Sequence, residues 1–180
     1  MESSNELGDF NLLISCIRNR ERNAVLEVED LVGGVVGDRS VEAKLTGIRS
    51  LLVAETSIDP REVIKKLREK AIEDPWRFQY TLKYVPIDLV VPTKFEMIVE
   101  GSKKIIPRIM RQETFRVTCN KRHCQLHCGE IVRSVASLID NKVDLENPDK
   151  VLQIEVLGDR TGLVVLDHHD VLSLAAPRIS

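Results

Sequence analysis

The sequence predicts a mixed α/β (α+β) protein with two domains, and three observations carry this prediction. The chain has 180 residues, which suits one large domain or two small ones. Hydrophobic residues make up 43% of the chain and aromatic residues only 4%, so the cores must rest on Val, Ile and Leu. Strand-like and helix-like segments alternate along the chain, and a segment with two prolines, 85–92, separates them into two sets. We therefore expect domains over 1–92 and 93–180.

The first domain is expected to contain four strands and two helices. Apolar residues alternate in the strand segments 10–17, 41–45 and 78–84, and 51–55 follows 41–45 after a short turn as its expected antiparallel partner. Apolar residues recur at helical spacing over 23–35, and we expect Gly33, Gly34 and Gly37 to end this helix.

A second helix in this domain is predicted to begin at Asp59 and Pro60. Asp is a good N-cap residue, and Pro suits the first helical position because it has no N–H to leave unsatisfied. Pro75 follows the end of this helix. The resulting order, βαββαβ, is the split pattern of a ferredoxin-like domain over about residues 8–92.

The second domain is also expected to combine helices and strands. An apolar helical pattern begins near Lys94 and is interrupted by Gly101 and again by Pro107. Segment 113–119 alternates, so Phe115, Val117 and Cys119 should share the face that meets the core. The remaining elements are a helix over 130–139 and strands over 151–157 and 163–166, which GDRTG separates.

Positive charge is concentrated in one segment, although the whole chain carries a net charge of −2. Segment 103–122 holds seven basic residues and one acidic residue, Glu113, so its net charge is +6. A basic segment in a mildly acidic chain suggests a local site for a polyanion, and its alternative is an ordinary solvated surface. The basic residues are Lys103, Lys104, Arg108, Arg111, Arg116, Lys121 and Arg122.

The stretch CNKRHCQLHC, residues 119–128, holds three of the four cysteines and two of the four histidines. Structural zinc usually takes two chelating pairs from separate segments, and no second pair follows this stretch. A redox pair is not expected because the chain has no CxxC. We interpret Cys119 as a small core residue at the end of a strand and Cys128 as part of a helix start. Four unevenly spread cysteines in a reducing compartment do not predict a disulfide framework.

As a charge pattern, the same stretch predicts a phosphate site. Arg116 should lie on the strand face opposite the core residues, and Lys121 and Arg122 follow at the strand end. The loop then leads into a helix whose first N–H groups and dipole favour anions.

No complete catalytic motif is present, so we expect a binding protein without catalytic residues, metal or cofactor. DHHD, residues 167–170, would suit a metal-dependent hydrolase, but such a site needs further carboxylates such as an Asp-x-Asp pair, which the chain lacks. A polar strand end is the favoured interpretation, and the hydrolase is kept as an alternative. GGVVGDRS, residues 33–40, does not meet the phosphate-loop pattern.

No apolar run approaches the roughly 18 residues of a membrane span, and the polar, acidic start MESSNELGDF is not a secretory signal. We therefore expect a cytoplasmic protein that does not bind membranes.

The sequence resembles a THUMP domain over about residues 94–172, and the motifs that show this begin at Glu113. The motifs that carry the resemblance are a strand ending in Lys121-Arg122, a helix opened near Glu130-Ile131, the loop VDLENPD at 143–149, and the strand and turn from Ile154 through Gly158-Asp159 to Gly162.

The resemblance implies binding of the tRNA acceptor stem and its unpaired CCA end, on a surface shared with a preceding ferredoxin-like domain. By resemblance, Arg116, Lys121 and Arg122 fall at basic positions of the family, whereas the roles of the other four basic residues rest on charge alone. The chain departs from the family at His123, Cys124, His127 and Cys128, which leaves a metal or redox role open.

Most members of the family carry a catalytic domain after the THUMP domain, whereas this chain stops at Ser180. This arrangement resembles a stand-alone adaptor for a tRNA cytidine acetyltransferase. We therefore expect tRNA and such an acetyltransferase as partners, and no DNA. The alternatives are an RNA-binding subunit of a methylating or thiolating enzyme, and a protein-interaction module that docks a modification enzyme.

Overall fold

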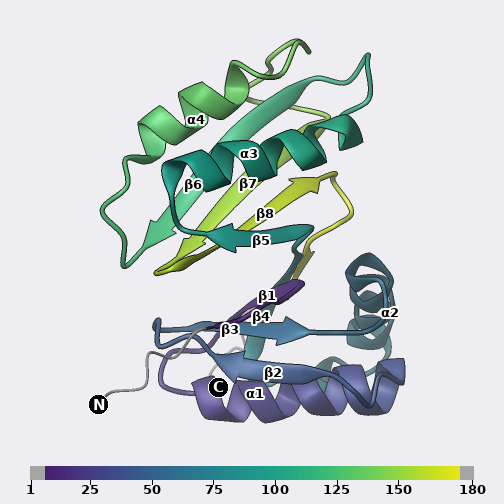
Figure 1. The fold of residues 1–180 in the computed structure, drawn as a ribbon. Coiled ribbons are helices and arrows are strands. Elements are labelled where there is room, and N and C mark those ends of the chain that lie inside the picture. The colour runs from purple at the N-terminus through teal and green to yellow at the C-terminus, as the bar shows by residue number, and fades with distance from the viewer. Residues whose placement is uncertain (1–6, 175–180) are drawn as a thin grey trace, which may run out of the picture. The chain divides into compact units, whose positions relative to one another are not determined.

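The computed structural model describes residues 7–174, and the chain divides into two compact units (Figure 1). Within the described residues, the first domain consists of Asp9–Ile87 and 169–174. The second domain consists of Asp88–His168 together with Leu7 and Gly8. The boundary expected at 92/93 thus lies at 87/88 in the structure, and the chain crosses back into the first domain after His168.

The first domain holds an antiparallel sheet in the order β2-β3-β1-β4-β9. Its first four strands have the connectivity and order of a ferredoxin-like domain, which confirms the βαββαβ prediction. The fifth strand comes from the returning segment and pairs Leu172 with Tyr84. The strands are β1 (Leu12–Cys16), β2 (Glu42–Leu45), β3 (Leu51–Glu55), β4 (Thr81–Pro86) and β9 (Leu172–Ser173).

The first helical segment continues further than the sequence suggested. Helix α1 (Glu21–Val28) runs directly into a π-helical segment, η1 (Glu29–Val36). The prediction that Gly33 and Gly34 end the helix is wrong, because both lie inside η1. Gly37 ends it with a φ of 95°, a left-handed conformation that glycine adopts without a steric cost.

The second helix, α2 (Pro60–Glu73), begins where the sequence placed it, because the Asp59 side chain accepts a hydrogen bond from the Arg61 N–H. It is followed by a short 3-10 turn, η2 (Pro75–Arg77). Apolar side chains of α1, η1 and α2 form one core with the side chains of the sheet, including Leu12, Ile14, Leu52 and Tyr84.

A buried carboxylate ties together the two loops at one end of this domain. Asp38, whose exposed fraction is 4%, accepts hydrogen bonds from the hydroxyls of Ser40, Thr56 and Ser57 and from the backbone of Ser40 and Ser57. These donors, led by the Ser40 and Thr56 hydroxyls, hold the pKa of Asp38 well below its usual range. The ionised carboxylate therefore joins the turn after η1 to the end of β3.

The second domain contains a four-stranded mixed sheet in the order β5-β8-β7-β6. Strands β6 and β7 are parallel, and the other neighbouring pairs are antiparallel. The elements are β5 (Leu89–Pro92), α3 (Phe95–Ile105), η3 (Ile106–Arg108), β6 (Phe115–Arg122), α4 (Cys128–Ala136), β7 (Lys150–Leu157) and β8 (Arg160–Leu166). Strand β5 lies in the segment that the sequence assigned to a strand end and linker.

Both helices of this domain cover the same face of its sheet, as Figure 1 shows. Gly101 does not interrupt α3 but lets it approach the sheet closely. A Cβ at Gly101 would lie 2.8 Å from Leu163 Cδ1 and 2.9 Å from Val91 Cγ1. The absence of a side chain therefore sets the distance between α3 and strands β5 and β8.

Across residues 7–174, no helix has the length and apolar character that crossing a membrane would require.

Candidate nucleic-acid interface

Strand β6 presents two chemically different faces. Phe115 and Val117 are buried in the core under α3 and α4, and Cys119 packs against that core. The alternate residues therefore lie on the face that the helices leave uncovered. These residues are Arg116, Thr118, Asn120 and Arg122, and the register of the parallel pair sets Gln153 and Glu155 of β7 beside Thr118 and Asn120.

Arg122 is held by a buried acid. Its Nη1 lies 2.7 Å from Glu155 Oε2, and Glu155 is only 3% exposed. Asn120 Nδ2 also donates to Glu155 Oε1, at 3.0 Å, and Gln153 Nε2 donates to the same oxygen. The predicted phosphate contact Arg122 is thus fixed in place by a charge partner that uses one of its terminal nitrogens.

Lys121 and Arg116 also make contacts within the domain. Lys121, which is exposed, donates from Nζ to the Leu126 carbonyl over 3.1 Å, across the loop that follows β6. Arg116 donates from Nη1 to the Leu145 carbonyl over 2.8 Å. Within the described part of the chain, the buried Arg116 Nε and Thr118 Oγ1 have no hydrogen-bond partner.

The other four predicted residues lie at the opposite end of the domain. Lys103 and Lys104 are in the last turn of α3, Arg108 is in η3, and Arg111 follows it. Lys103 pairs with Glu100 at 2.7 Å, and Arg108 lies 3.7 Å from Asp88. We call these four residues the Lys103 group.

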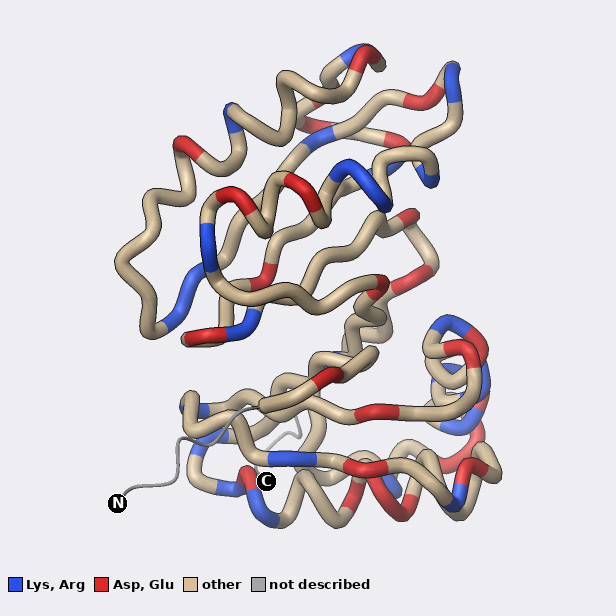
Figure 2. Tube along the Cα trace, viewed as in Figure 1, with Lys and Arg blue, Asp and Glu red and all other residues tan. Residues whose placement is uncertain are grey.

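The seven predicted residues do not form one surface, and Figure 2 shows the basic segments at separate places along the second domain. Arg111 precedes β6, whereas Lys121 and Arg122 end it. The strand has eight residues, so at roughly 3.3 Å per residue its two ends lie about 25 Å apart.

Two basic residues that the sequence analysis missed join Lys121 and Arg122 at their end of the sheet. Arg122 pairs with Leu157, Leu157 with Arg160, and Arg160 with Pro92, so one edge gathers the ends of all four strands. Lys94 follows two residues after Pro92, at the N-cap of α3. We call the residues Lys94, Lys121, Arg122 and Arg160 the Lys121 edge. Lys94 and Arg160 were missed because only strand pairing brings them there, β7 with β8 for Arg160 and β5 with β8 for Lys94.

Two helices begin at this edge. Helix α3 starts directly after Lys94, and α4 starts at Cys128, after the loop that follows Arg122. For these two helices, no described side chain caps the first turn. Free N–H groups at a helix start, together with the helix dipole, form a favourable place for an anion. Acidic side chains are also present there, namely Glu96 and Glu130 in the first turns and Asp159 in the turn before Arg160.

The cysteine-rich stretch is closed by a disulfide between Cys119 and Cys128, whose Cα atoms are 5.6 Å apart. The interpretation of Cys119 as only a core residue, and the expectation of reduced cysteines, are therefore corrected. Cys128 does begin α4, as predicted. The sequence did not reveal the pair because the spacing of two cysteines does not show that a strand and a helix start meet.

The remaining Cys and His residues of this stretch lie in the loop between β6 and α4. Cys124 is a partly buried thiol whose Sγ accepts a hydrogen bond from the Leu126 N–H. His123 has a φ of 55° where the chain leaves β6, and His127 is the N-cap residue of α4. Among the described side chains, no group of three or more His, Cys, Asp and Glu residues is arranged to hold a metal ion.

The DHHD tetrad lies where the chain passes between the two domains. Asp170 Oδ2 is 3.3 Å from Arg61 Nε, and Arg68 Nη2 donates to the carbonyls of His169 and Val171. Two arginines of α2 therefore hold the returning segment, which gives the end of this tetrad a structural role.

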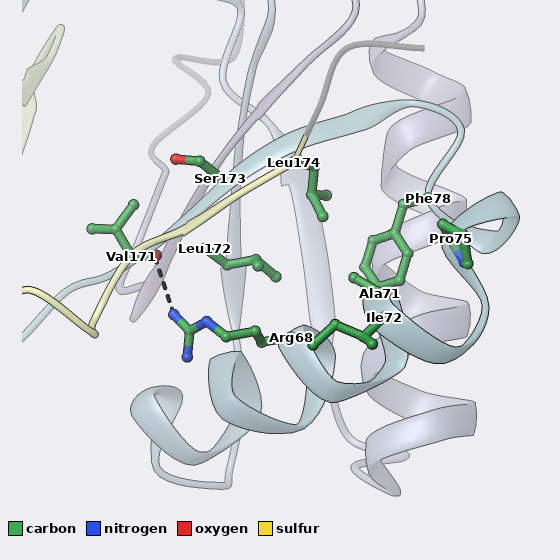
Figure 3. A pocket seen from close by; sticks show the side chains of 9 residues that line it. All are labelled: Arg68, Ala71, Ile72, Pro75, Phe78, Val171, Leu172, Ser173 and Leu174. Carbon is green, nitrogen blue, oxygen red and sulfur yellow. Dashed lines mark hydrogen bonds between the residues drawn. The ribbon is translucent and has the colours of Figure 1, made fainter.

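A groove with a volume of about 530 Å³ lies between α2 and the returning segment (Figure 3). Figure 3 shows Arg68 reaching toward Val171 at one end of the groove and the Phe78 ring at the other. Ile72 also lines the groove, with 80% of its surface exposed.

Together these features define a two-domain α+β protein in which basic side chains and two helix starts share one edge of the second sheet. Residues 92–166 match the THUMP domain family, so the chain contains a THUMP domain. No curated protein matches the chain.

Several solved structures share the fold, including the three that follow. The crystal structure of PH1313 from Pyrococcus horikoshii has a TM-score of 0.64 and 14% identity, covering 92% of this chain and 55% of that one. A 4-thiouridine synthetase in complex with RNA and ATP has a TM-score of 0.59 and 17% identity, covering 93% and 43%. TrmN from Thermus thermophilus has a TM-score of 0.57 and 15% identity, covering 86% and 44%. This chain thus spans about half the length of the structures it resembles.

Proposed function

We propose that this chain binds tRNA at its acceptor end and presents it to a separate tRNA cytidine acetyltransferase, without a catalytic step of its own. The observation that carries the tRNA-binding part is the Lys121 edge of the THUMP domain. There, basic side chains and two uncapped helix starts lie together. One structure with this fold is a 4-thiouridine synthetase in complex with RNA, which supports RNA as the ligand.

The chemistry of the edge suits the phosphates of an unpaired end. Lysine and arginine side chains supply affinity that does not depend on base sequence, and helix N–H groups fix the position of a phosphate. Recognition would then come from shape, a stem that ends in a single strand. The Lys103 group, about one strand length away, is proposed to contact phosphates of the stem.

Binding of intact tRNA and of tRNA without its CCA end, followed by fluorescence anisotropy, tests this proposal. We expect the triple variant Lys94→Ala, Lys121→Ala and Arg160→Ala to bind intact tRNA at least roughly tenfold more weakly, and to lose the preference for the CCA end. The matched control, Lys103→Ala, Lys104→Ala and Arg111→Ala, removes the same charge from the other end. It should weaken both tRNAs equally. Wild-type protein that binds the two tRNAs with equal affinity would contradict the acceptor-end proposal.

A second candidate is an RNA-binding subunit for methylation or thiolation of tRNA. It is favoured by two structures with this fold, a 4-thiouridine synthetase and a possible methylase from Clostridium difficile. Mass spectrometry of tRNA nucleosides from a deletion strain separates the candidates. Loss of acetylcytidine supports the acetyltransferase partner, whereas loss of a methylated or thiolated nucleoside supports the second candidate.

A further inference from the structure

The disulfide closes the loop of residues 119–128, which carries two of the proposed RNA contacts, Lys121 and Arg122. We propose that Cys119 and Cys128 are a reversible thiol–disulfide pair whose oxidised form strengthens RNA binding at the Lys121 edge. This inference rests on the proposed function, because it concerns the affinity of the same edge. The oxidant is a small disulfide of the glutathione class, and the reductant is the corresponding thiol.

The bond joins the two elements that meet at the edge. Cys119 is in β6, and Cys128 is the first residue of α4, nine positions later. Lys121 lies inside the closed loop and reaches across it to the Leu126 carbonyl. The disulfide therefore fixes the start of α4 relative to Lys121. A phosphate bound at the edge would then contact the α4 N-terminus and Lys121 in a single geometry.

Strand pairing holds Lys121 and Arg122 beside β7, and Cys124 and Leu126 pack against the core, so the disulfide mainly restricts the part of the loop between Arg122 and α4. Leu126 donates its N–H to Cys124 Sγ, and the Ile131 N–H donates to the His127 carbonyl. Opening the disulfide would let the loop occupy more conformations, and binding would then have to restrict them again. Arg122 should respond less, because Glu155 holds it in both redox states.

The two cysteines are accessible to small thiols and disulfides. Cys119 and Cys128 are both partly exposed, whereas Cys16 is buried in the first domain. Burial, with help from the negative charges of Glu21 and Glu27, raises the pKa of the Cys16 thiol to about 11, which keeps it unreactive. Cys124 is also partly exposed, so it is the one competing thiol within the same loop.

The small disulfide oxidises the cysteine pair by thiol–disulfide exchange in two steps. A thiolate at Cys119 or Cys128 attacks one sulfur of the small disulfide, forms a mixed disulfide and releases one small thiol. The other cysteine then attacks the protein sulfur of that mixed disulfide and releases the second small thiol. The protein gives up two electrons and two protons, which appear in the two small thiols, and an excess of small thiol reverses both steps.

The test uses the full chain, equilibrated in glutathione buffers from fully reducing to fully oxidising. Alkylation and peptide mass spectrometry identify the bonded cysteines, and anisotropy gives the affinity for intact tRNA in each buffer. We expect a bond between Cys119 and Cys128 and roughly three- to tenfold tighter binding in the oxidised form. The variant Cys119→Ser with Cys128→Ser should bind like the reduced wild type in every buffer, whereas Cys124→Ser should keep the full redox response.

The outcomes separate this inference from the proposed function. Equal tRNA affinity of oxidised and reduced wild-type protein, or a bond that involves Cys124 instead, overturns the redox inference and leaves tRNA binding intact. If neither redox state binds tRNA, the proposed function fails and this inference fails with it. The comparison of the two wild-type states decides the matter even if the double serine variant does not fold, because it uses a single protein.

Discussion

Arg122 and Glu155 face each other on neighbouring parallel strands, with the guanidinium Nη1 2.7 Å from the carboxylate. Glu155 is nearly inaccessible to solvent, so its charge relies on Arg122 and on two amide groups. Removing either partner of such a pair leaves the other charge buried without compensation.

We therefore expect Arg122→Ala to lower the free energy of unfolding by about 1–3 kcal/mol, because Glu155 would lose its charge partner. The double variant Arg122→Ala with Glu155→Gln should recover part of this loss, which urea denaturation measures. Lys121→Ala is the neighbouring control and should cost less than about 1 kcal/mol, because Lys121 is exposed. Equal stabilities for the single and double Arg122 variants would show that Glu155 does not depend on Arg122.

The Asp38 carboxylate should make the protein sensitive to acid. Its pKa in the folded protein lies below the value of about 4 that an unfolded chain has, so its contribution is present above that pH. The contribution is lost as the pH falls toward the folded-state pKa. Wild-type protein should therefore be more stable than Asp38→Asn at pH 7, and the difference should shrink below about pH 4.

Thermal unfolding at a series of pH values measures this difference for Asp38→Asn. The exposed Asp30 supplies the control, since Asp30→Asn changes a side chain that is 65% exposed. A stability difference for Asp38→Asn that stays constant from pH 7 to pH 3 would contradict the assignment.

Gly101 should resist substitution because of its position against the sheet. An added methyl group would meet Leu163 and Val91 at less than 3 Å, so Gly101→Ala is expected to cost about 1–3 kcal/mol of stability. Both contacts are side-chain ends, which can move, so the loss should be moderate. Gly34→Ala is a matched control inside a helical segment, where the nearest atom is 3.7 Å away. It should be neutral or stabilise by up to about 1 kcal/mol.

Arg68 should hold the returning segment on the first domain. It donates to the carbonyls of His169 and Val171, just before β9. Arg68→Ala should speed hydrogen exchange at the Leu174 N–H, which bonds to the Leu82 carbonyl, by roughly tenfold. Lys66→Ala, on the exposed side of α2, should leave that exchange rate unchanged. Equal rates in both variants would show that Arg68 does not anchor the segment.

The sequence predicted the regular elements well where one physical signal dominated. Alternating apolar residues located β1 and β2, and the Asp59-Pro60 pair located the start of α2. The prediction that Gly33 and Gly34 end the first helix was wrong, because packing of Leu31, Val32 and Val36 in the core stabilises the continuous helical segment. Propensity is a weak guide when burial favours a continuous helix.

The candidate site was only partly predictable, because it depends on which strands are neighbours. Lys121 and Arg122 were found from local charge, but local charge also grouped them with Lys103, which lies at the other end of the domain. Arg160 reaches the edge through its pairing with Leu157 of β7, and Lys94 through the antiparallel pairing of β5 and β8. The same long-range arrangement brings Cys119 to Cys128, and spacing along the chain does not encode it.

The position of β9 determines which fragments of the protein keep a complete sheet. Since the fifth strand of the first sheet comes from residues 172–173, the chain leaves the first domain after Ile87 and returns to it after His168. A fragment that stops at residue 92 lacks β9, so the outer edge of β4 would be unpaired. The core residues that Leu172 covers would then be exposed to water. An unpaired strand edge is prone to pair with another molecule. A fragment of residues 88–168 keeps all four strands of the second sheet.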